Sequence, residues 1–96
     1  MIREVKVVKH SDRELILEIY GEDHTLGNMI AKEALKHPAV EYAAYRIPHP
    51  LQDKMEFYLI VKEGYDPGQV LVEVCEKLKQ YLREFRERVE EVLSEA

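Results

Sequence analysis

Two segments near the start of the chain alternate between apolar and polar residues. Residues 2–8 read IREVKVV and residues 14–20 read ELILEIY. Successive side chains of a β-strand point to opposite faces, so this alternation predicts two strands joined by the polar stretch between them. In the second segment, Leu15, Leu17 and Ile19 share one face, which we expect to be buried.

A different spacing follows over residues 25–36. Apolar residues recur there at intervals of three and four and form a stripe of Leu26, Met29, Ile30 and Ala34. This spacing predicts a helix with one apolar side. Thr25 is the expected N-cap, and Pro38 sets the end of the helix because the residue before a proline disfavours helical geometry.

The next two apolar segments, residues 39–47 and 55–62, again predict strands. The residues of the second segment that are expected to face the core are Met55, Phe57, Leu59 and Val61. Pro48 and Pro50 lie between the segments, where the loss of two backbone donors favours a stiff turn.

The clearest pattern covers about residues 67–94. Asp66 is a suitable N-cap, and Pro67 suits the first helical position. The apolar positions that follow are Leu71, Val74, Leu78, Tyr81, Phe85 and Val92, with Cys75, Leu82 and Val89 widening the stripe. Their three-and-four spacing predicts one long amphipathic helix.

The predicted order is therefore two strands, a helix, two strands and a helix (ββαββα). It indicates an α+β fold with a four-stranded, mainly antiparallel sheet and two helices on one face. The length of 96 residues suits a single domain, residues 1–96, with one modest core.

The last helix is longer than such a domain needs. It spans about 42 Å at 1.5 Å per residue, whereas a compact domain of this length is roughly 30 Å across. Its apolar stripe nevertheless continues through Phe85, Val89, Val92 and Leu93. An apolar stripe beyond the edge of its own sheet predicts contact with another chain. The alternative is a frayed or folded-back end.

Gly27 has two interpretations. Glycine costs about 1 kcal/mol relative to alanine inside a helix, so its presence in the first turn calls for a structural reason. The missing side chain leaves space either for the backbone of a partner chain or for a close fit against this chain's own sheet. The sequence does not decide between the two.

The composition excludes several classes of function. The net charge is −5 at pH 7 and the basic residues are spread among acidic ones, which disfavours direct binding of nucleic acid. The apolar runs are too short to predict a membrane span. The single cysteine, Cys75, cannot form an internal disulfide, so a reducing, cytoplasmic location is expected.

No residue cluster predicts a catalytic, cofactor or metal site. The four histidines are His10, His24, His37 and His49. None of them forms a spaced pair with a cysteine or carboxylate that is typical of a metal site. Cys75 falls on the apolar stripe, which favours a small buried hydrophobic residue over a nucleophile.

Two other classes of function stay open. A small enzyme of the pterin dehydratase kind has a comparable plan of sheet and helices, but it acts through clustered histidines. An RNA-binding sheet stacks bases on strand aromatics beside basic residues. The candidates for stacking are Tyr42, Phe57 and Tyr58, although Phe57 belongs to the predicted core face.

Three segments of the chain together resemble a known family. They are EDHTLGNMI at 22–30, AVEYAAYRIPHPL at 39–51 and EGYDP at 63–67. In this order and spacing they resemble the signature of the small alpha-like subunits of archaeal and eukaryotic RNA polymerases. The short chain, rich in Glu, Lys and Arg, is most similar to the archaeal members.

That resemblance implies a non-catalytic subunit with the fold of the dimerisation domain of RNA polymerase alpha. It implies a heterodimer with the larger alpha-like subunit, called D in archaea. It also implies that this pair, with the small zinc-binding subunits N and P, forms the platform on which the large catalytic subunits assemble for transcription.

The resemblance also indicates which residues bind the partner. The motif associated with pairing falls on Leu26, Gly27, Asn28, Met29 and Ile30. The last helix is expected to supply the rest of the surface through Leu78, Tyr81, Leu82, Phe85, Val89 and Val92. Residues 83–96 carry no family motif, so their role rests on the apolar stripe alone.

Overall fold

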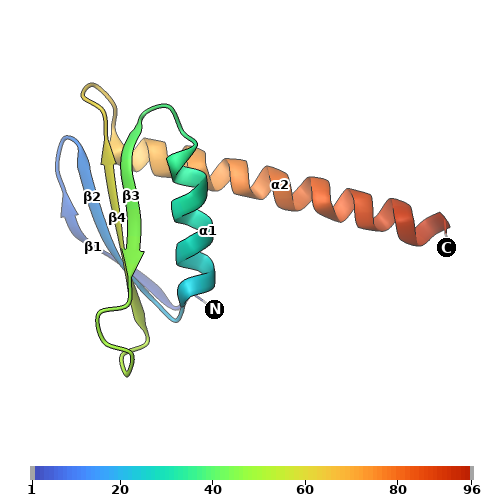
Figure 1. Ribbon diagram of the computed structural model, residues 1–96, viewed down its shortest axis with the longest axis horizontal. Helices are drawn as coiled ribbons and strands as arrows, with labels where there is room; N and C mark the ends of the chain where they lie inside the picture. Colours follow the sequence, from blue (N-terminus) through green and yellow to red (C-terminus); the bar gives the residue numbers. More distant parts are fainter. Residues whose placement is uncertain (1, 96) are drawn as a thin grey trace.

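The computed structural model describes residues 2–95, so residues 1 and 96 of the predicted domain lie outside the described range. Its elements are β1 Glu4–His10, β2 Glu14–Tyr20, α1 His24–Leu35, β3 Val40–Arg46, β4 Lys54–Val61 and α2 Pro67–Glu95 (Figure 1). The predicted order is confirmed. β1 lies two residues later than predicted, and the other element ends agree to within one residue.

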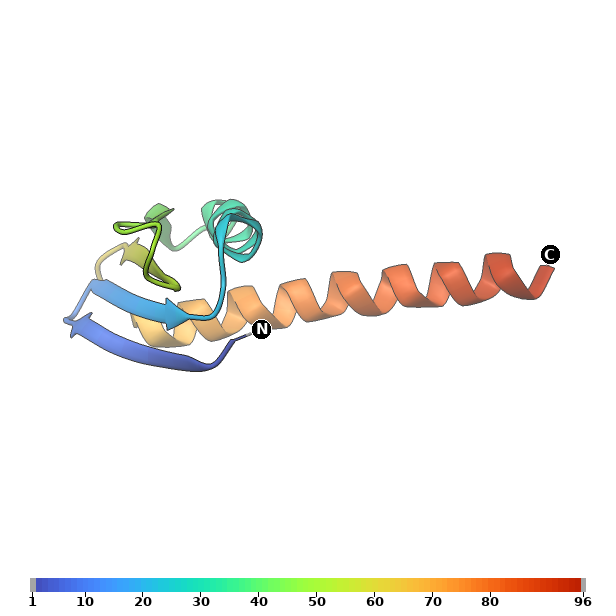
Figure 2. The same cartoon turned by 90° about the horizontal axis from the view of Figure 1, so that it is seen from below.

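The four strands form one antiparallel sheet in the order β1-β2-β4-β3. β2 and β4 are the central strands and pair along their full length, from Glu14 opposite Ile60 to Tyr20 opposite Lys54. Figure 2 shows both helices on the concave side of this curved sheet. The predicted α+β class, with two helices on one face of a four-stranded sheet, is therefore confirmed.

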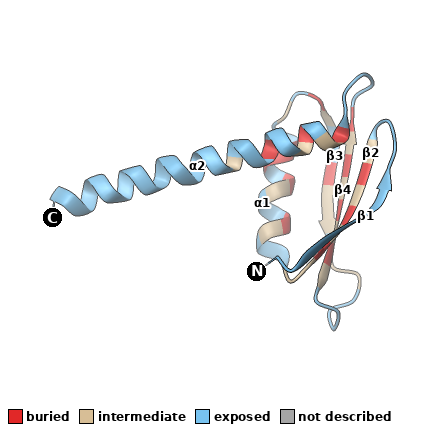
Figure 3. Cartoon of the chain, turned by 180° about the vertical axis from the view of Figure 1, so that it is seen from behind, coloured by how far each residue is buried: buried red, intermediate tan, exposed pale blue. Residues whose placement is uncertain are grey.

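The core lies between the helices and the concave face of the two central strands. As predicted, the buried strand residues are Leu15, Leu17 and Ile19 in β2 and Met55, Phe57, Leu59 and Val61 in β4. The cluster is completed by Ala31 and Ala34 of α1, Ala39 and Ala43 before and in β3, and Val70 and Val74 of α2. The residues between these strand positions are only partly buried, since they lie on the face opposite the helices (Figure 3).

The start and the orientation of α1 differ from the prediction. Asp23, not Thr25, is the N-cap: its carboxylate accepts a hydrogen bond from the Thr25 backbone N–H at 3.0 Å. Asp23 precedes Thr25 by two residues, so its carboxylate can accept from the unpaired N–H groups of the first turn. The positive end of the helix also stabilises its negative charge. The helix also buries Gly27, Ala31 and Ala34, which leaves Met29 exposed.

α2 begins at the predicted residue, but most of its length extends away from the sheet. The Asp66 carboxylate accepts a hydrogen bond from the Gln69 backbone N–H at 3.0 Å and caps the helix. Only Pro67, Val70 and Val74 of its 29 residues are buried. The expectation that Cys75 is buried is therefore wrong, because its side of the helix is not covered by the sheet and the residue is exposed. Every described residue from Lys79 onward is exposed, and the helix projects far beyond the sheet (Figures 1 and 3). The predicted overhang is confirmed, and the described part of the helix neither folds back nor loses its helical form.

Candidate partner-binding surface

The projecting half of α2 carries a continuous apolar stripe, and only its first member, Tyr81, has another element of this chain beside it. Its members, which we call the tail stripe, are Tyr81, Leu82, Phe85, Val89, Val92 and Leu93. Phe85 is 68% exposed and Val92 is 66% exposed. Because the stripe follows helical spacing, all these side chains point to one side of the helix and present an apolar band to a partner.

Charged residues flank this stripe along the projecting helix, and several of them are paired. Arg86 lies 3.3 Å from Glu90, and Arg88 lies 3.2 Å from Glu91. Such solvent-exposed pairs, three or four residues apart, stabilise a helix by only about 0.2–0.5 kcal/mol each. They support the helical form of a segment that has no core beneath it and keep the charged side turned to water.

The partner-binding motif predicted on α1 is divided by the fold. Leu26 and Ile30 are half-buried and pack against the core, whereas Asn28 and Met29 are exposed. Gly27 is buried. Of the five motif residues, Asn28 and Met29 therefore present the most surface to another chain, and Leu26 and Ile30 present part of theirs.

The fold also decides between the two interpretations of Gly27. A Cβ atom at this position would lie 2.6 Å from two ring atoms of Tyr45 and would collide with the sulfur of Met55. Both residues belong to this chain's own sheet. The idea that Gly27 makes room for a partner backbone is therefore wrong, because the space is already filled by β3 and β4.

Leu78, in contrast, lies where the buried and exposed parts of α2 meet. It is half-buried and packs on the edge of the core, one turn before the tail stripe begins. Tyr81 is 42% exposed, and the ammonium groups of Lys36 and Lys77 each lie 5.8 Å from the centre of its ring. The predicted α2 residues thus form one band that runs from the core to the end of the helix.

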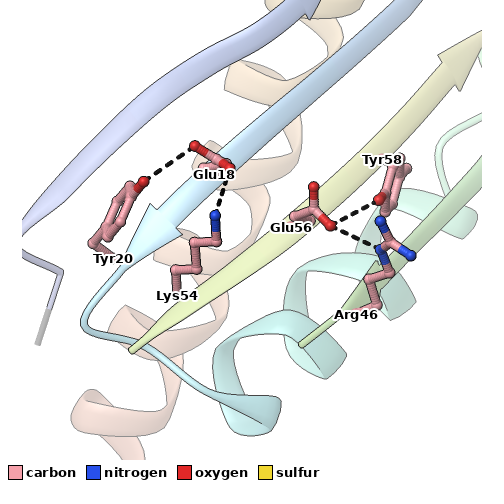
Figure 4. Close-up of polar contacts among 6 residues, drawn as sticks. All are labelled: Glu18, Tyr20, Arg46, Lys54, Glu56 and Tyr58. Carbon is pink, nitrogen blue, oxygen red and sulfur yellow. Dashed lines mark hydrogen bonds and ion pairs between the residues drawn. The ribbon is translucent and has the colours of Figure 1, made fainter. Parts of the chain in front are cut away.

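The convex face of the sheet carries a polar network that the sequence did not reveal. The Lys54 ammonium and the Tyr20 hydroxyl donate to Glu18, at 3.0 and 3.1 Å (Figure 4). The hydrogen bond from Lys54 is the main reason that the pKa of Glu18 is lowered. The alternation along one strand predicts which face a side chain occupies. Which side chain of the neighbouring strand it meets depends on the register between the two strands.

A second set lies beside the first and bears on the RNA-binding alternative. Arg46 Nε and the Tyr58 hydroxyl both donate to Glu56 Oε1, at 2.8 and 3.1 Å (Figure 4). Burial, followed by the Glu56 hydrogen bond, raises the pKa of Tyr58. Phe57 is fully within the core. Lys54 and Arg46 are each paired with a carboxylate, which weakens the positive charge that would attract RNA to this part of the face.

Three of the four histidines each lie beside a different residue of this chain. His10 lies 3.6 Å from Asp66, His24 lies 3.2 Å from the Tyr45 hydroxyl, and His37 lies 2.8 Å from Glu73. The hydrogen bond with His37 is also the main cause of the lowered pKa of Glu73. Residues 2–95 contain no group of three or more His, Cys, Asp or Glu side chains placed to hold a metal ion.

No helix in the described part of the chain combines the length and apolar character needed to cross a membrane. The apolar band on α2 is exposed, and an exposed apolar band of this kind marks a site for another protein. A small α+β domain with such a projecting helix belongs, by its geometry, to the class of protein-pairing domains.

Comparison with known proteins specifies that class. Residues 14–88 match the model of the RNA polymerase Rpb3/Rpb11 dimerisation domain, and the chain belongs to this family. The DNA-directed RNA polymerase subunit Rpo11 of Sulfolobus acidocaldarius is 33% identical over 89 residues, covering 93% of this chain and 99% of that protein. Rpo11 of Saccharolobus shibatae is 40% identical over 76 residues, covering 79% and 83%.

A solved structure agrees with these relatives. The crystal structure of DNA-directed RNA polymerase subunit L from Thermoplasma acidophilum superposes with a TM-score of 0.80 at 25% identity. The match covers 92% of this chain and 86% of that one. This chain is accordingly a subunit of an RNA polymerase and not the part that carries out the catalysis.

Proposed function

We propose that this chain is the small alpha-like subunit of an archaeal RNA polymerase, equivalent to subunit L, and that it forms a heterodimer with the larger alpha-like partner, the archaeal D subunit. The observation that carries the proposal is the tail stripe. In a member of a dimerisation family, an exposed apolar band on a projecting helix is the natural contact for the other member of the pair.

The proposal extends to assembly. The D–L pair, together with the small subunits N and P, is the platform on which the large catalytic subunits assemble. The chain acts in the cytoplasm and makes no direct contact with nucleic acid. Its acidic net charge of −5 and the balanced charges of its convex face support this role in pairing rather than in binding DNA.

Co-expression with the D subunit of the same organism tests the pairing. A tag on D alone should recover both chains in equal amounts through affinity and size-exclusion steps. Recovery of D without this chain, with both chains soluble, would contradict the proposal.

A matched pair of variants localises the contact. Phe85→Ser removes a tail-stripe side chain, and Glu87→Ser changes the charged side of the same helical turn. Burying a phenylalanine contributes about 1.5–3 kcal/mol, so Phe85→Ser should weaken pairing by roughly 10- to 100-fold. Glu87→Ser should pair almost as the wild type does. Equal losses in the two variants would mean that helix stability, and not the stripe, controls pairing.

A further inference from the structure

His37 lies in the short connection between α1 and β3, directly after the C-cap residue Lys36. Its side chain contacts two different parts of the chain. The ring Nδ1 accepts a hydrogen bond from the Ala39 backbone N–H at 3.0 Å, and Nε2 lies 2.8 Å from Oε1 of Glu73, in the second turn of α2. The imidazole ring therefore joins the corner between α1 and β3 to the start of α2.

The contact with Ala39 fixes the tautomer of this ring. A backbone N–H can only donate, so Nδ1 has to be the unprotonated nitrogen. The proton of the neutral ring is then on Nε2, from which it is donated to the Glu73 carboxylate. Ala39 is buried, so water is not available to replace the ring as the acceptor for its N–H. The local turn thus prepares His37 as a donor to α2.

Glu73 is the matching acceptor. Its pKa is lowered chiefly by the hydrogen bond from His37, so it carries a negative charge at neutral pH. The two lysines that line the same cavity, Lys36 and Lys77, both place their ammonium groups beside the ring of Tyr81 instead. Among the described residues, His37 is therefore the one side chain that ties Glu73 to another element.

The rest of the attachment of α2 is apolar. Val70 and Val74 are buried in the core, and Leu78 is half-buried. Within residues 2–95, no hydrogen bond other than the one from His37 joins a side chain of α2 to another element. Apolar contact is not directional, whereas a hydrogen bond requires its donor and acceptor to be aligned. The contact between His37 and Glu73 therefore restrains the angle of the helix in a way that the apolar contacts do not.

The length of α2 makes this angle important. Nineteen residues separate Glu73 from Val92. They span about 28 Å of helix, so a tilt of about 10° at Glu73 moves Val92 by about 5 Å. A helix whose direction is already fixed also loses less freedom when it binds. The tail stripe is therefore best presented to one partner surface when the exit angle of α2 is held.

We propose that His37, in the Nε2–H tautomer set by Ala39, fixes the direction in which α2 leaves the domain and so positions the tail stripe for its partner. His37 is then a positioning residue that acts through Glu73. The consequence for pairing rests on the proposed heterodimer. The direction of the helix is a property of the free chain, so the two can be measured separately.

Two substitutions remove the contact from opposite sides. His37→Asn keeps an acceptor for the Ala39 N–H, because an asparagine side chain bonds the backbone N–H two residues later, but it is too short to reach α2. Glu73→Ala removes the acceptor on α2, and Glu73→Gln keeps an oxygen there that accepts from Nε2–H. The control is Glu76→Ala, which removes an exposed carboxylate less than one turn further along the same helix.

The direction of α2 is followed by the distance between two spin labels. One label is attached at Lys32→Cys on α1 and the other at Glu87→Cys on the projecting helix, both of which are exposed positions, in a Cys75→Ser background. The labelled chain is diluted with an excess of unlabelled chain, so distances between molecules do not contribute even where copies associate. Electron–electron resonance then reports the distribution of the distance within one chain.

The unsubstituted chain and Glu76→Ala should give one narrow distribution. In His37→Asn and in Glu73→Ala the distribution should widen or shift by about 4 Å, which is the displacement of residue 87 for a tilt of about 10°. The double variant should add nothing further, because both changes remove the same contact. Glu73→Gln should lie between wild type and Glu73→Ala. Unchanged distributions in both single variants would overturn the inference.

Nitrogen NMR of the free chain tests the tautomer directly. Spectra are recorded at about pH 8, where an ordinary histidine ring is neutral. The signals of His37 are identified by their loss in His37→Asn. A protonated Nε2 with an unprotonated Nδ1 is the expected result, and the opposite tautomer would contradict the role given to Ala39.

Pairing with D is measured last, with the same variants. His37→Asn and Glu73→Ala should each weaken pairing by about threefold to tenfold, because a helix of unfixed direction has to be ordered on binding. Unchanged pairing despite a widened distance distribution would mean that the exit angle does not serve the partner, and the inference would be wrong. Failure of the wild-type chain to pair with D would refute the proposed function, while the spin-label distances would still decide whether His37 sets the direction of α2.

Discussion

Glu18 on β2 and Glu56 on β4 are direct cross-strand partners on the convex face of the sheet. Like charges in this position destabilise an antiparallel pair. Each carboxylate instead has its own cation: Lys54 lies 3.0 Å from Glu18, and Arg46 lies 2.8 Å from Glu56. The two negative charges at the centre of this face are therefore balanced by the two neighbouring cations (Figure 4).

Replacing Lys54 by methionine should lower the melting temperature of the free chain by a few degrees at neutral pH, because the two carboxylates then face each other with one cation. The Lys54 hydrogen bond keeps the pKa of Glu18 below its ordinary value of 4.5. A carboxyl with a lowered pKa stabilises the fold above its unfolded pKa, and this contribution is lost as the pH falls through the folded pKa.

The difference in melting temperature between wild type and Lys54→Met should therefore be full at neutral pH and shrink in acid, below the ordinary carboxyl pKa of 4.5. Circular dichroism melts across this range measure it. Lys62→Met, on an exposed lysine just after β4, is the control and should show little effect at any pH. A difference for Lys54→Met that stays constant into strong acid would mean that the charge of Glu18 is not involved.

Gly27→Ala should destabilise the free chain even though alanine is the better helix former. Alanine gains about 1 kcal/mol in helix propensity, whereas an added methyl that collides with Tyr45 and Met55 costs typically about 1–3 kcal/mol in a packed core. Gly27→Leu should be worse. Urea unfolding of the free chain measures both, with Asn28→Ala on the exposed neighbour as the control. A more stable Gly27→Ala chain would show that the side chains of Tyr45 and Met55 move aside at little cost.

The order of the elements could be predicted because each one has a strong local signal. Alternation marks β2 and β4, and a cap, a proline and three-and-four spacing mark α2. The side of α1 that faces the sheet could not be predicted in the same way. Small residues at positions 27, 31 and 34 allow close packing, and this packing outweighs the stripe of larger residues that includes Met29.

The candidate site was predictable where it depends on one element and not where it depends on several. The tail stripe follows from the spacing and length of α2 alone. His10 at the end of β1 lies beside Asp66 at the start of α2, and a contact between segments so far apart in the sequence needs the fold to be seen. The pairing of Glu18 with Lys54 likewise depends on strand register, which a single sequence does not specify.

Glu33 offers a further test of stability. It is only 6% exposed, one of its carboxylate oxygens has no hydrogen-bond partner in the described structure, and the other lies 3.9 Å from Lys36. An unsatisfied buried acceptor costs about 1–3 kcal/mol, and an apolar side chain of similar size removes that cost. Glu33→Met should therefore raise the melting temperature of the free chain, whereas Lys32→Met, on the exposed neighbour, should not. A lower melting temperature for Glu33→Met would indicate that ordered water already satisfies the carboxylate.

Truncation after Arg83 should separate folding from pairing. The removed segment contains Phe85, Val89, Val92 and Leu93, all of which are exposed in the free chain. Val70 and Val74 remain and still cover the sheet, so amide exchange in β2 and β4 should stay slow. Pairing with D should be strongly reduced. Rapid exchange throughout the truncated sheet would show that the end of α2 supports the domain itself.

Omitting this chain from a reconstituted polymerase should yield unassembled large subunits rather than a complete but inactive enzyme. Nucleotide transfer requires carboxylates that converge on magnesium, and residues 2–95 provide no such group. As a member of a dimerisation-domain family, the chain is expected to contribute through the surfaces it offers to other subunits. Size-exclusion chromatography of the mixture, with and without this chain, shows whether the large subunits come together. Adding the Phe85→Ser chain should restore less complex than adding the Glu87→Ser chain. A fully assembled, inactive polymerase formed without this chain would place its role in the chemistry and contradict the assembly function.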